Sequence, residues 1–180
     1  MSWTSMRARD TAAKLLGGES QRWAHVQRTA QLTRSRSGGS QGGNALEIAA
    51  WLHDIGYSSA LLDTGMHAID GARYLKRLYA PPVVVSLVAF HTGAEYEAEE
   101  RGVLAELSEF DRPPQPILDQ LILADLLSGP DGKAMAIHTR IDDMLMRYSP
   151  KHPVHRAVTR SRGYLEASAM RADARSRQPM

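Results

Sequence analysis

Several side chains that can bind a metal ion are spread widely along the chain. In order, they are His25, the adjacent pair His53 and Asp54, His91, and Asp125. Imidazole nitrogen and carboxylate oxygen suit Mn, Fe, Co, Ni, Zn and Mg without selecting among them. The chain contains no cysteine, which excludes disulfides, thiolate nucleophiles and cysteine-based zinc sites. Any metal must therefore be held by nitrogen and oxygen ligands.

Asp125 is the most informative of these residues because it stands in the apolar run Leu121–Leu127. A carboxylate among apolar side chains carries a desolvation penalty unless a cation or several hydrogen-bond donors compensate it. Its expected position in the middle of a helix argues against a capping role. The partner is then a metal ion or an arginine. The arginines considered are Arg22, Arg28 and Arg140.

Taken singly, the other residues say little. A lone histidine on a partly apolar helix, such as His25 in RWAHVQRTA, is usually an ordinary core or surface residue. The dipeptide His53-Asp54, taken alone, also carries little information, because such a pair occurs by chance. Separate helices of a bundle can nevertheless direct side chains to one interior point. The joint pattern, rather than any single residue, therefore indicates a site.

Helices must bring these residues together, and the sequence predicts an all-α bundle. Apolar residues recur at spacings of three and four, and the alternation typical of strands is absent over any useful length. We expect Ser20 and Asn44 to be helix N-caps, with His53 and Asp54 at a helix C-terminus. The expected helices cover 10–16, 20–35, 44 to about 56, 65–79, 82 to about 90, 94–107, 115–127, 133–148 and 153–172.

The 180 residues, 43% of them apolar, have the size of a single domain. We expect residues 1–180 to form that domain, with its core over about 10–170, a flexible loop over 35–44 (SRSGGSQGGN) and a frayed tail over 174–180. No run approaches the roughly 20 apolar residues that span a bilayer. The sequence therefore predicts a cytoplasmic protein with no membrane partner.

The formal net charge is only +2. The total charge balance does not indicate a broad nucleic-acid-binding face. A nucleic-acid partner is therefore not expected, whereas a small phosphorylated molecule suits the chain. A homo-oligomer is compatible with the sequence, which does not determine the oligomeric state.

The order H…HD…D, with the pair extended to HDIG in WLHDIGY, resembles the signature of the HD superfamily of metal-dependent phosphohydrolases. The resemblance covers about 22–147 and implies an HD-domain helical bundle with its metal site in the interior. The implied reaction is hydrolysis of a phosphoester or phosphoanhydride of a nucleotide-like substrate by metal-activated water. Asp54 is the ligand best suited to bridge metals or orient that water. The implied ligands of one divalent metal are His25, His53, Asp54 and Asp125.

Two further histidines match HD subfamilies that bind a second metal through the HD aspartate. His67 in TGMHAIDGARYL and His91 in VAFHTGAEYE lie at the corresponding places. The layout is similar to that of small HDIG proteins of the diadenosine tetraphosphate hydrolase type, including Gly71-Ala72. It implies one or two divalent ions, with His67 and His91 as second-site ligands or phosphate contacts. The alternative is an exposed His67 and a His91 that interacts with a helix dipole.

Tyr57 departs from the family pattern, because many HDIG enzymes carry a lysine there that assists at the phosphate. This leaves the identity of the leaving-group acid open. The alternative function is a catalytically weak or inactive HD module that binds metal and nucleotide in signalling. A helical protein-interaction unit with coincidental histidines is a third reading. Phe90 precedes His91 where a double histidine is needed, and no GYP follows, which disfavours cyclic di-GMP cleavage. Tyr57-Ser58 in place of an acidic pair disfavours ppGpp hydrolysis.

Two arginines are candidates for contact with a substrate phosphate. Arg28 follows His25 by one helical turn, a spacing that places side chains on neighbouring positions of one face. Arg22 precedes His25 on the same predicted helix. The alternative is that both are ordinary surface arginines.

Overall fold

The computed structural model describes residues 2–36 and 41–177, and within these ranges the fold is helical without a strand. An isolated bridge joins Ser128 and Ala134. The α-helices are α1 (Ser5–Leu16), α2 (Ser20–Arg36), α3 (Gln41–Leu52), α4 (His67–Arg77), α5 (Pro82–Phe90), α6 (Ala94–Arg101), α7 (Leu104–Leu107), α8 (Gln115–Leu126), α9 (Ile137–Arg147) and α10 (Pro153–Ser176). The short 3-10 helices are η1 (Ile55–Tyr57), η2 (Ser59–Leu61) and η3 (His91–Gly93).

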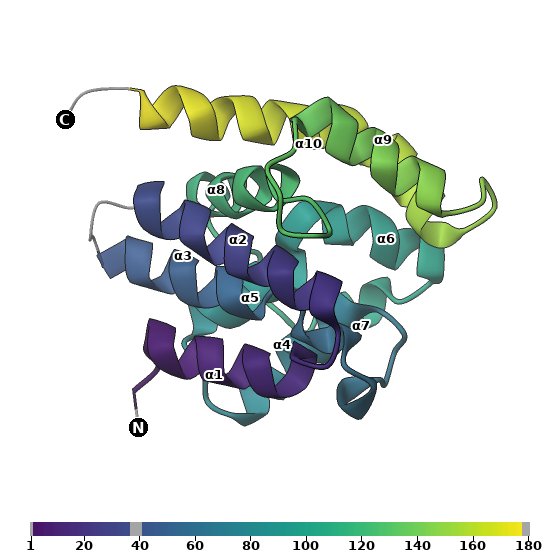
Figure 1. The fold of residues 1–180 in the computed structure, drawn as a ribbon. Helices are drawn as coiled ribbons and strands as arrows, with labels where there is room; N and C mark the ends of the chain where they lie inside the picture. Colours follow the sequence, from purple (N-terminus) through teal and green to yellow (C-terminus); the bar gives the residue numbers. More distant parts are fainter. Residues whose placement is uncertain (1, 37–40, 178–180) are drawn as a thin grey trace.

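The all-α prediction is confirmed, and α5 is the least obvious of the predicted helices. The segment Val83–Val85 favours a strand locally, because β-branched side chains are stiff. All residues from Val84 to Phe90 are nevertheless buried within α5. A helix that is apolar on every side is stable when other helices surround it. In Figure 1, α2 and α3 run side by side, α1 lies against α3, and α10 lies along α8.

Several predicted helix boundaries are wrong because caps and glycines act locally. The first helix begins at Ser5 rather than residue 10, since the Thr4 side chain accepts a hydrogen bond from the Arg7 backbone N–H and caps it. The predicted helix 94–107 is divided into α6 and α7 at Gly102, whose φ of 72° is left-handed. The predicted helix 133–148 begins only at Ile137.

The predicted flexible loop and frayed tail are also wrong at their edges. Helix α2 continues to Arg36 and α3 begins at Gln41, so 35–36 and 41–44 of the predicted loop are helical, and 37–40 lie outside the described residues. Ser20 and Asn44 therefore lie inside helices rather than at N-caps. Helix α10 continues to Ser176, and the rest of the predicted tail from 178 onward also lies outside the described residues.

Helix α10 is attached to α8 by a buried carboxylate. The side chain of Asp119 on α8 is fully buried, with 0% of its surface exposed. It accepts hydrogen bonds from Arg171 and Arg175 on α10 and from Gln115 on α8. Burial alone would raise the pKa of Asp119, but these hydrogen bonds outweigh it and hold the pKa below its usual value. The carboxylate is therefore charged and compensated at neutral pH.

Removing both arginines is expected to leave this buried charge uncompensated. The variant carrying Arg171→Ala and Arg175→Ala should lose about 3 kcal/mol of unfolding free energy at pH 7, measured by urea denaturation. In the parent, the lowered pKa of Asp119 stabilises the fold above the ordinary aspartate pKa, and this contribution is lost as the pH falls through the folded-state pKa. In the variant, unopposed burial raises the pKa of Asp119. The deficit of the variant should therefore shrink as the pH falls.

The matched control is Arg177→Ala, which removes an arginine paired with the exposed Asp173 near the end of the same helix. Surface ion pairs contribute little, so this change should leave the urea midpoint nearly unchanged. Equal losses in the control and the double variant would contradict the role assigned to Asp119.

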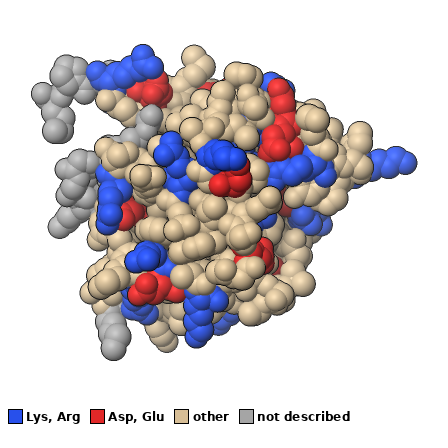
Figure 2. Space-filling model, in the orientation of Figure 1, with Lys and Arg blue, Asp and Glu red and all other residues tan. Residues whose placement is uncertain are grey.

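The surface mixes charges of both signs. Over the face shown in Figure 2, lysine and arginine side chains lie next to aspartate and glutamate side chains. Many are paired, as Arg160 is with Glu99 and Glu100. Within the described residues, no helix combines the length and apolar character needed to cross a membrane.

Candidate metal centre

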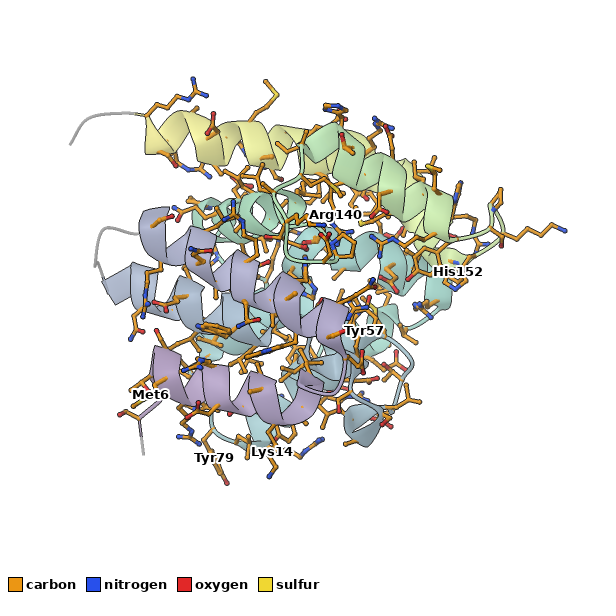
Figure 3. The ribbon with its side chains drawn as sticks, viewed as in Figure 1. Met6, Lys14, Tyr57, Tyr79, Arg140 and His152 are labelled. Atoms are coloured by element: carbon orange, nitrogen blue, oxygen red, sulfur yellow. The ribbon has the colours of Figure 1, made fainter. Side chains whose placement is uncertain are left out.

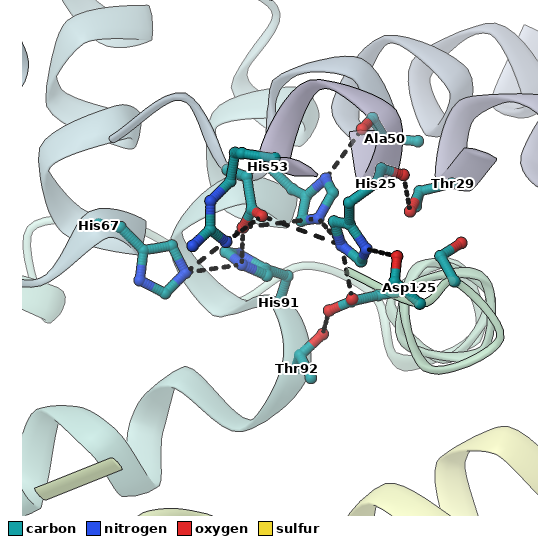
Figure 4. A network of polar contacts seen from close by, with 12 residues as sticks. His25, Thr29, Ala50, His53, His67, His91, Thr92 and Asp125 are labelled. Carbon is teal, nitrogen blue, oxygen red and sulfur yellow. Dashed lines mark hydrogen bonds and ion pairs between the residues drawn. The ribbon is translucent and has the colours of Figure 1, made fainter. Parts of the chain in front are cut away.

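All of the predicted ligand side chains converge on one point in the interior of the bundle (Figure 4). Five are buried, with 0–5% of each residue exposed, and the His67 side chain is 13% exposed. Asp125 lies in the last turn of its helix rather than in the middle, as had been expected. By element, they are His25 on α2, His53 and Asp54 in the turn after α3, His67 at the start of α4, His91 after α5, and Asp125 on α8.

One group of possible ligand atoms lies between α2 and the turn after α3. The ligand atoms of His25, His53 and Asp54 all lie within 4.8 Å of one another. The Nε2 atoms of His25 and His53 are 3.2 Å apart. Asp125 extends this group, because its Oδ1 lies 3.1 Å from Nε2 of His25. Two imidazoles and two carboxylates therefore face a common centre.

A second group shares Asp54 with the first. The ligand atoms of Asp54, His67 and His91 also lie within 4.8 Å of one another. The Nε2 atoms of His67 and His91 are 3.1 Å apart, and Asp54 Oδ1 lies 3.7 and 3.8 Å from them. Asp54 therefore stands between two pairs of imidazoles, which is the arrangement needed for a carboxylate that bridges two cations.

Backbone carbonyls fix which nitrogen of each imidazole faces the centre. The Nδ1 atoms of His25, His53 and His91 lie 3.2, 2.8 and 2.7 Å from carbonyl oxygens. A carbonyl only accepts, so each Nδ1 carries the hydrogen and each neutral ring presents the lone pair of Nε2 to the centre. Two lone pairs facing each other at about 3 Å repel unless a proton or a metal ion lies between them. The donor set therefore fits a divalent metal.

The two carboxyl groups are held in the charged form. Burial alone would raise the pKa of Asp54, but the charges of His53 and Arg22 outweigh it and hold the pKa well below its usual range. Burial likewise opposes ionisation of Asp125, and the hydrogen bond from His25 outweighs it and lowers the pKa. Both side chains can thus act as anionic ligands at neutral pH.

The histidines divide into two kinds. Burial lowers the pKa of His53 to about 4, and burial together with the neighbouring His91 lowers the pKa of His67. Burial also acts on His25 and His91, but the facing carboxylates of Asp125 and Asp54 outweigh it and raise both pKa values. Where an imidazole holds a proton beside a carboxylate, a cation would compete for the same position.

Thr92 is a site residue that the sequence reasoning did not identify. Its hydroxyl donates a hydrogen bond to Oδ2 of Asp125. Its backbone has φ 43° and ψ 49°, a left-handed conformation that costs a non-glycine residue about 1–3 kcal/mol. Because Thr92 directly follows His91, this conformation orients a histidine and an aspartate of the centre at once. The β-branched residue after a histidine gives no sequence signal for such a role.

Tyr57 lies between Arg22 and His67. Its ring stacks on the imidazole of His67, with 4.0 Å between the two ring centroids. The guanidinium carbon of Arg22 also contacts the Tyr57 ring and lies 3.5 Å from its centroid. Arg22 Nη1 also donates to Asp54 Oδ2 at 2.7 Å. The tyrosine that replaces the expected lysine therefore positions a cation beside the centre, although it carries no charge itself.

A cavity of about 90 Å³ opens onto the centre, and Arg22, Arg140 and Arg147 are part of its lining. The predicted Arg22 thus lies at the site. Arg28 lies outside the lining of this cavity, and its buried Nε has no hydrogen-bond partner among the described residues. The sequence had suggested Arg140 only as a partner for Asp125, from which its Nη2 lies 4.0 Å, and had not suggested Arg147.

The comparisons agree with the region that forms this centre. A family model described as HD domain matches residues 22–128. No curated protein and no solved structure matches the chain. The matched region includes every candidate ligand from His25 to Asp125, whereas α9 and α10 lie beyond it.

Proposed function

The chain belongs to the HD domain family, and from this premise we propose that it is a metal-dependent phosphohydrolase. The proposed reaction cleaves a phosphoester or phosphoanhydride bond of a nucleotide-like substrate. The observation that carries the proposal is the pair of ligand groups that share the buried Asp54. A divalent Fe, Mn, Co, Ni, Zn or Mg ion held there supplies Lewis acidity, which polarises a phosphoryl oxygen and lowers the pKa of water.

The roles of the ligands follow from their positions. Asp54 belongs to both groups and is assigned to bridge two ions. The residues assigned to the first ion, besides Asp54, are His25, His53 and Asp125. The residues assigned to the second ion, besides Asp54, are His67 and His91.

Two residues outside the ligand set are assigned to the substrate. The Arg22 guanidinium lines the cavity and can form charge-assisted hydrogen bonds to a phosphoryl oxygen. Tyr57 also lines the cavity, and the ordinary pKa of a tyrosine hydroxyl is about 10. Its hydroxyl therefore stays protonated at neutral pH and can donate a hydrogen bond to the substrate. Both groups favour the negative charge that develops during phosphoryl transfer.

Metal removal tests the proposal directly. The full chain, purified without a histidine tag, should contain bound metal and hydrolyse members of a panel of nucleotides, dinucleoside polyphosphates and nitrophenyl phosphates. Treatment with EDTA should abolish turnover, and Mn, Co or Ni should restore it. A chain that holds no metal and gains no activity with any of these ions would overturn the proposal. Bound metal without turnover would instead identify the inactive metal-binding and nucleotide-binding module.

A comparison of two histidine variants tests the second ligand group separately. His91→Ala should lower the metal content or the turnover at least about tenfold, because it removes a nitrogen that lies 3.1 Å from its partner Nε2 on His67. His138→Ala is the control, since His138 is exposed on α9 and lies outside both ligand groups. Metal analysis and initial rates are compared for the two variants. Similar effects would contradict the assignment of His91.

A further inference from the structure

We propose that a second cavity, bounded by the first turn of α2 and by arginines of α9, is a subsite for a phosphate group that is not cleaved. The cavity has a volume of about 410 Å³. It lies directly beside the candidate metal centre, because the two cavities share part of their lining. The shared residues are Arg22, His25, Arg140 and Arg147.

Arg140 is the strongest indication that this cavity takes an anion. The residue is only 7% exposed, and its buried Nε has no hydrogen-bond partner within the part of the chain that the structure describes. Figure 3 places it between α9 and the part of the bundle formed by α2 and α8. Its Nη1 donates to Asp143 at 3.1 Å, its Nη2 lies 4.0 Å from Asp125, and the residue lines both cavities. A buried guanidinium is costly unless anionic groups compensate its charge, and a phosphate in this cavity would add to the compensation by Asp143.

The charge balance at the cavity depends on the metal centre, because three guanidinium groups face four nearby carboxylates and two of these belong to that centre. Arg22 and Arg147 add two guanidinium groups to that of Arg140. The carboxylate of Asp143 pairs with both Arg140 and Arg147, and Glu19 also lines the cavity. Asp54 and Asp125 face Arg22 and Arg140 from the metal centre, at 2.7 and 4.0 Å. Bound metal would compensate these last two carboxylates and release the arginines for an anion.

Backbone groups add to this preference. Ser20 and Gln21, in the first turn of α2, line the cavity. The first N–H groups of a helix have no intrahelical partner, and the helix dipole favours negative charge at this end. Helix α2 has 17 residues, which is long enough for its dipole to contribute. Three guanidinium groups and the first turn of α2 thus line one cavity, and both features favour a phosphate.

This placement narrows the class of substrate. If one phosphoryl group is attacked at the metal centre, a neighbouring phosphate enters the second cavity, since arginines common to both linings stand between them. A phosphate monoester would leave this cavity without an anion. The preferred substrates are then diphosphates, polyphosphates or other phosphoanhydrides. This assignment of substrate rests on the proposed function, whereas anion binding by the cavity needs only bound metal at the neighbouring centre and no turnover.

The test is the binding of inorganic pyrophosphate to the full chain, measured by isothermal titration calorimetry. It is done on the protein as purified and again after EDTA treatment. The parent should bind pyrophosphate more tightly than inorganic phosphate, and Arg147→Gln should raise the Kd for pyrophosphate about tenfold or more. The matched control is Arg162→Gln on α10. The side chains of Arg147 and Arg162 are 39% and 40% exposed, and both are paired with carboxylates. A melting curve checks that each variant is folded.

The outcomes separate this inference from the proposed function. Pyrophosphate binding that is no tighter than phosphate binding in either form of the protein would overturn the subsite. An equal change in Kd for Arg147→Gln and Arg162→Gln would overturn it as well, even if the protein is an active hydrolase. Binding that depends on Arg147, in a protein without turnover, would support the subsite and contradict the proposed function.

Discussion

Asp54→Ala is expected to abolish turnover and to remove most of the bound metal. Asp54 is the single carboxylate common to both ligand groups, so its loss affects both proposed ions at once. Loss of an outer hydrogen-bond partner of a metal ligand already costs about 10–100-fold in metal affinity or activity. Loss of a shared ligand should cost more than about 100-fold. The measurements are metal content after purification and initial rates with saturating added Mn.

The matched control is Asp63→Ala. Asp63 is also an aspartate paired with an arginine, Arg73, but its side chain is 65% exposed and lies outside the ligand groups. This variant should keep the metal content and the rate of the parent. Asp54→Asn, which preserves the shape of the side chain, should resemble Asp54→Ala because an amide is not an anionic ligand. Activity retained in both Asp54 variants would exclude Asp54 from the reaction.

Gly56→Ala is expected to destabilise the fold by at least about 3 kcal/mol, or to prevent folding. A Cβ at this position would lie 1.9 Å from the carbonyl oxygen of His67 and 2.7 Å from the backbone nitrogen of Gly71. Both atoms belong to the backbone of α4, which cannot move without displacing the helix that carries His67. The clash therefore acts on stability and on the site together. Urea denaturation followed by circular dichroism measures the loss.

Gly163→Ala is the control for this substitution. Gly163 lies inside α10, and no heavy atom outside the local helix backbone lies within 4 Å of the position of its Cβ. Alanine is favoured over glycine in a helix interior by about 0.5–1 kcal/mol, so this variant should be slightly more stable than the parent. Similar stability in the two variants would show that η1 and α4 are not packed as closely as described.

The glycine of the HDIG motif thus has a packing role that the sequence alone did not reveal. Periodic apolar residues were sufficient to predict an all-α fold, because helix burial depends on spacing. They did not predict where helices begin or divide. Those positions depend on single interactions, such as the Thr4 cap and the left-handed Gly102.

The candidate ligands could be predicted because their order along the chain matches a known motif. The outcome differs between the two predicted arginines. Arg22 is held beside the centre by the hydrogen bond that its Nη1 donates to Asp54 at 2.7 Å. Arg22, on the turn before His25, reaches the site, and Arg28, on the turn after it, does not. Arg147 could not be predicted, since only tertiary packing brings α9 to the centre.

The position of helix α9 affects how the substrate preference of such a protein can change during evolution. The candidate metal ligands all lie within residues 22–128, whereas Arg140 and Arg147 lie on a later helix. Substitutions in that helix can change the size and charge of the cavity beside the centre while the ligand set stays intact. Relatives with identical metal ligands are therefore expected to differ in substrate preference through α9. Comparison of that helix will distinguish them better than comparison of the motif.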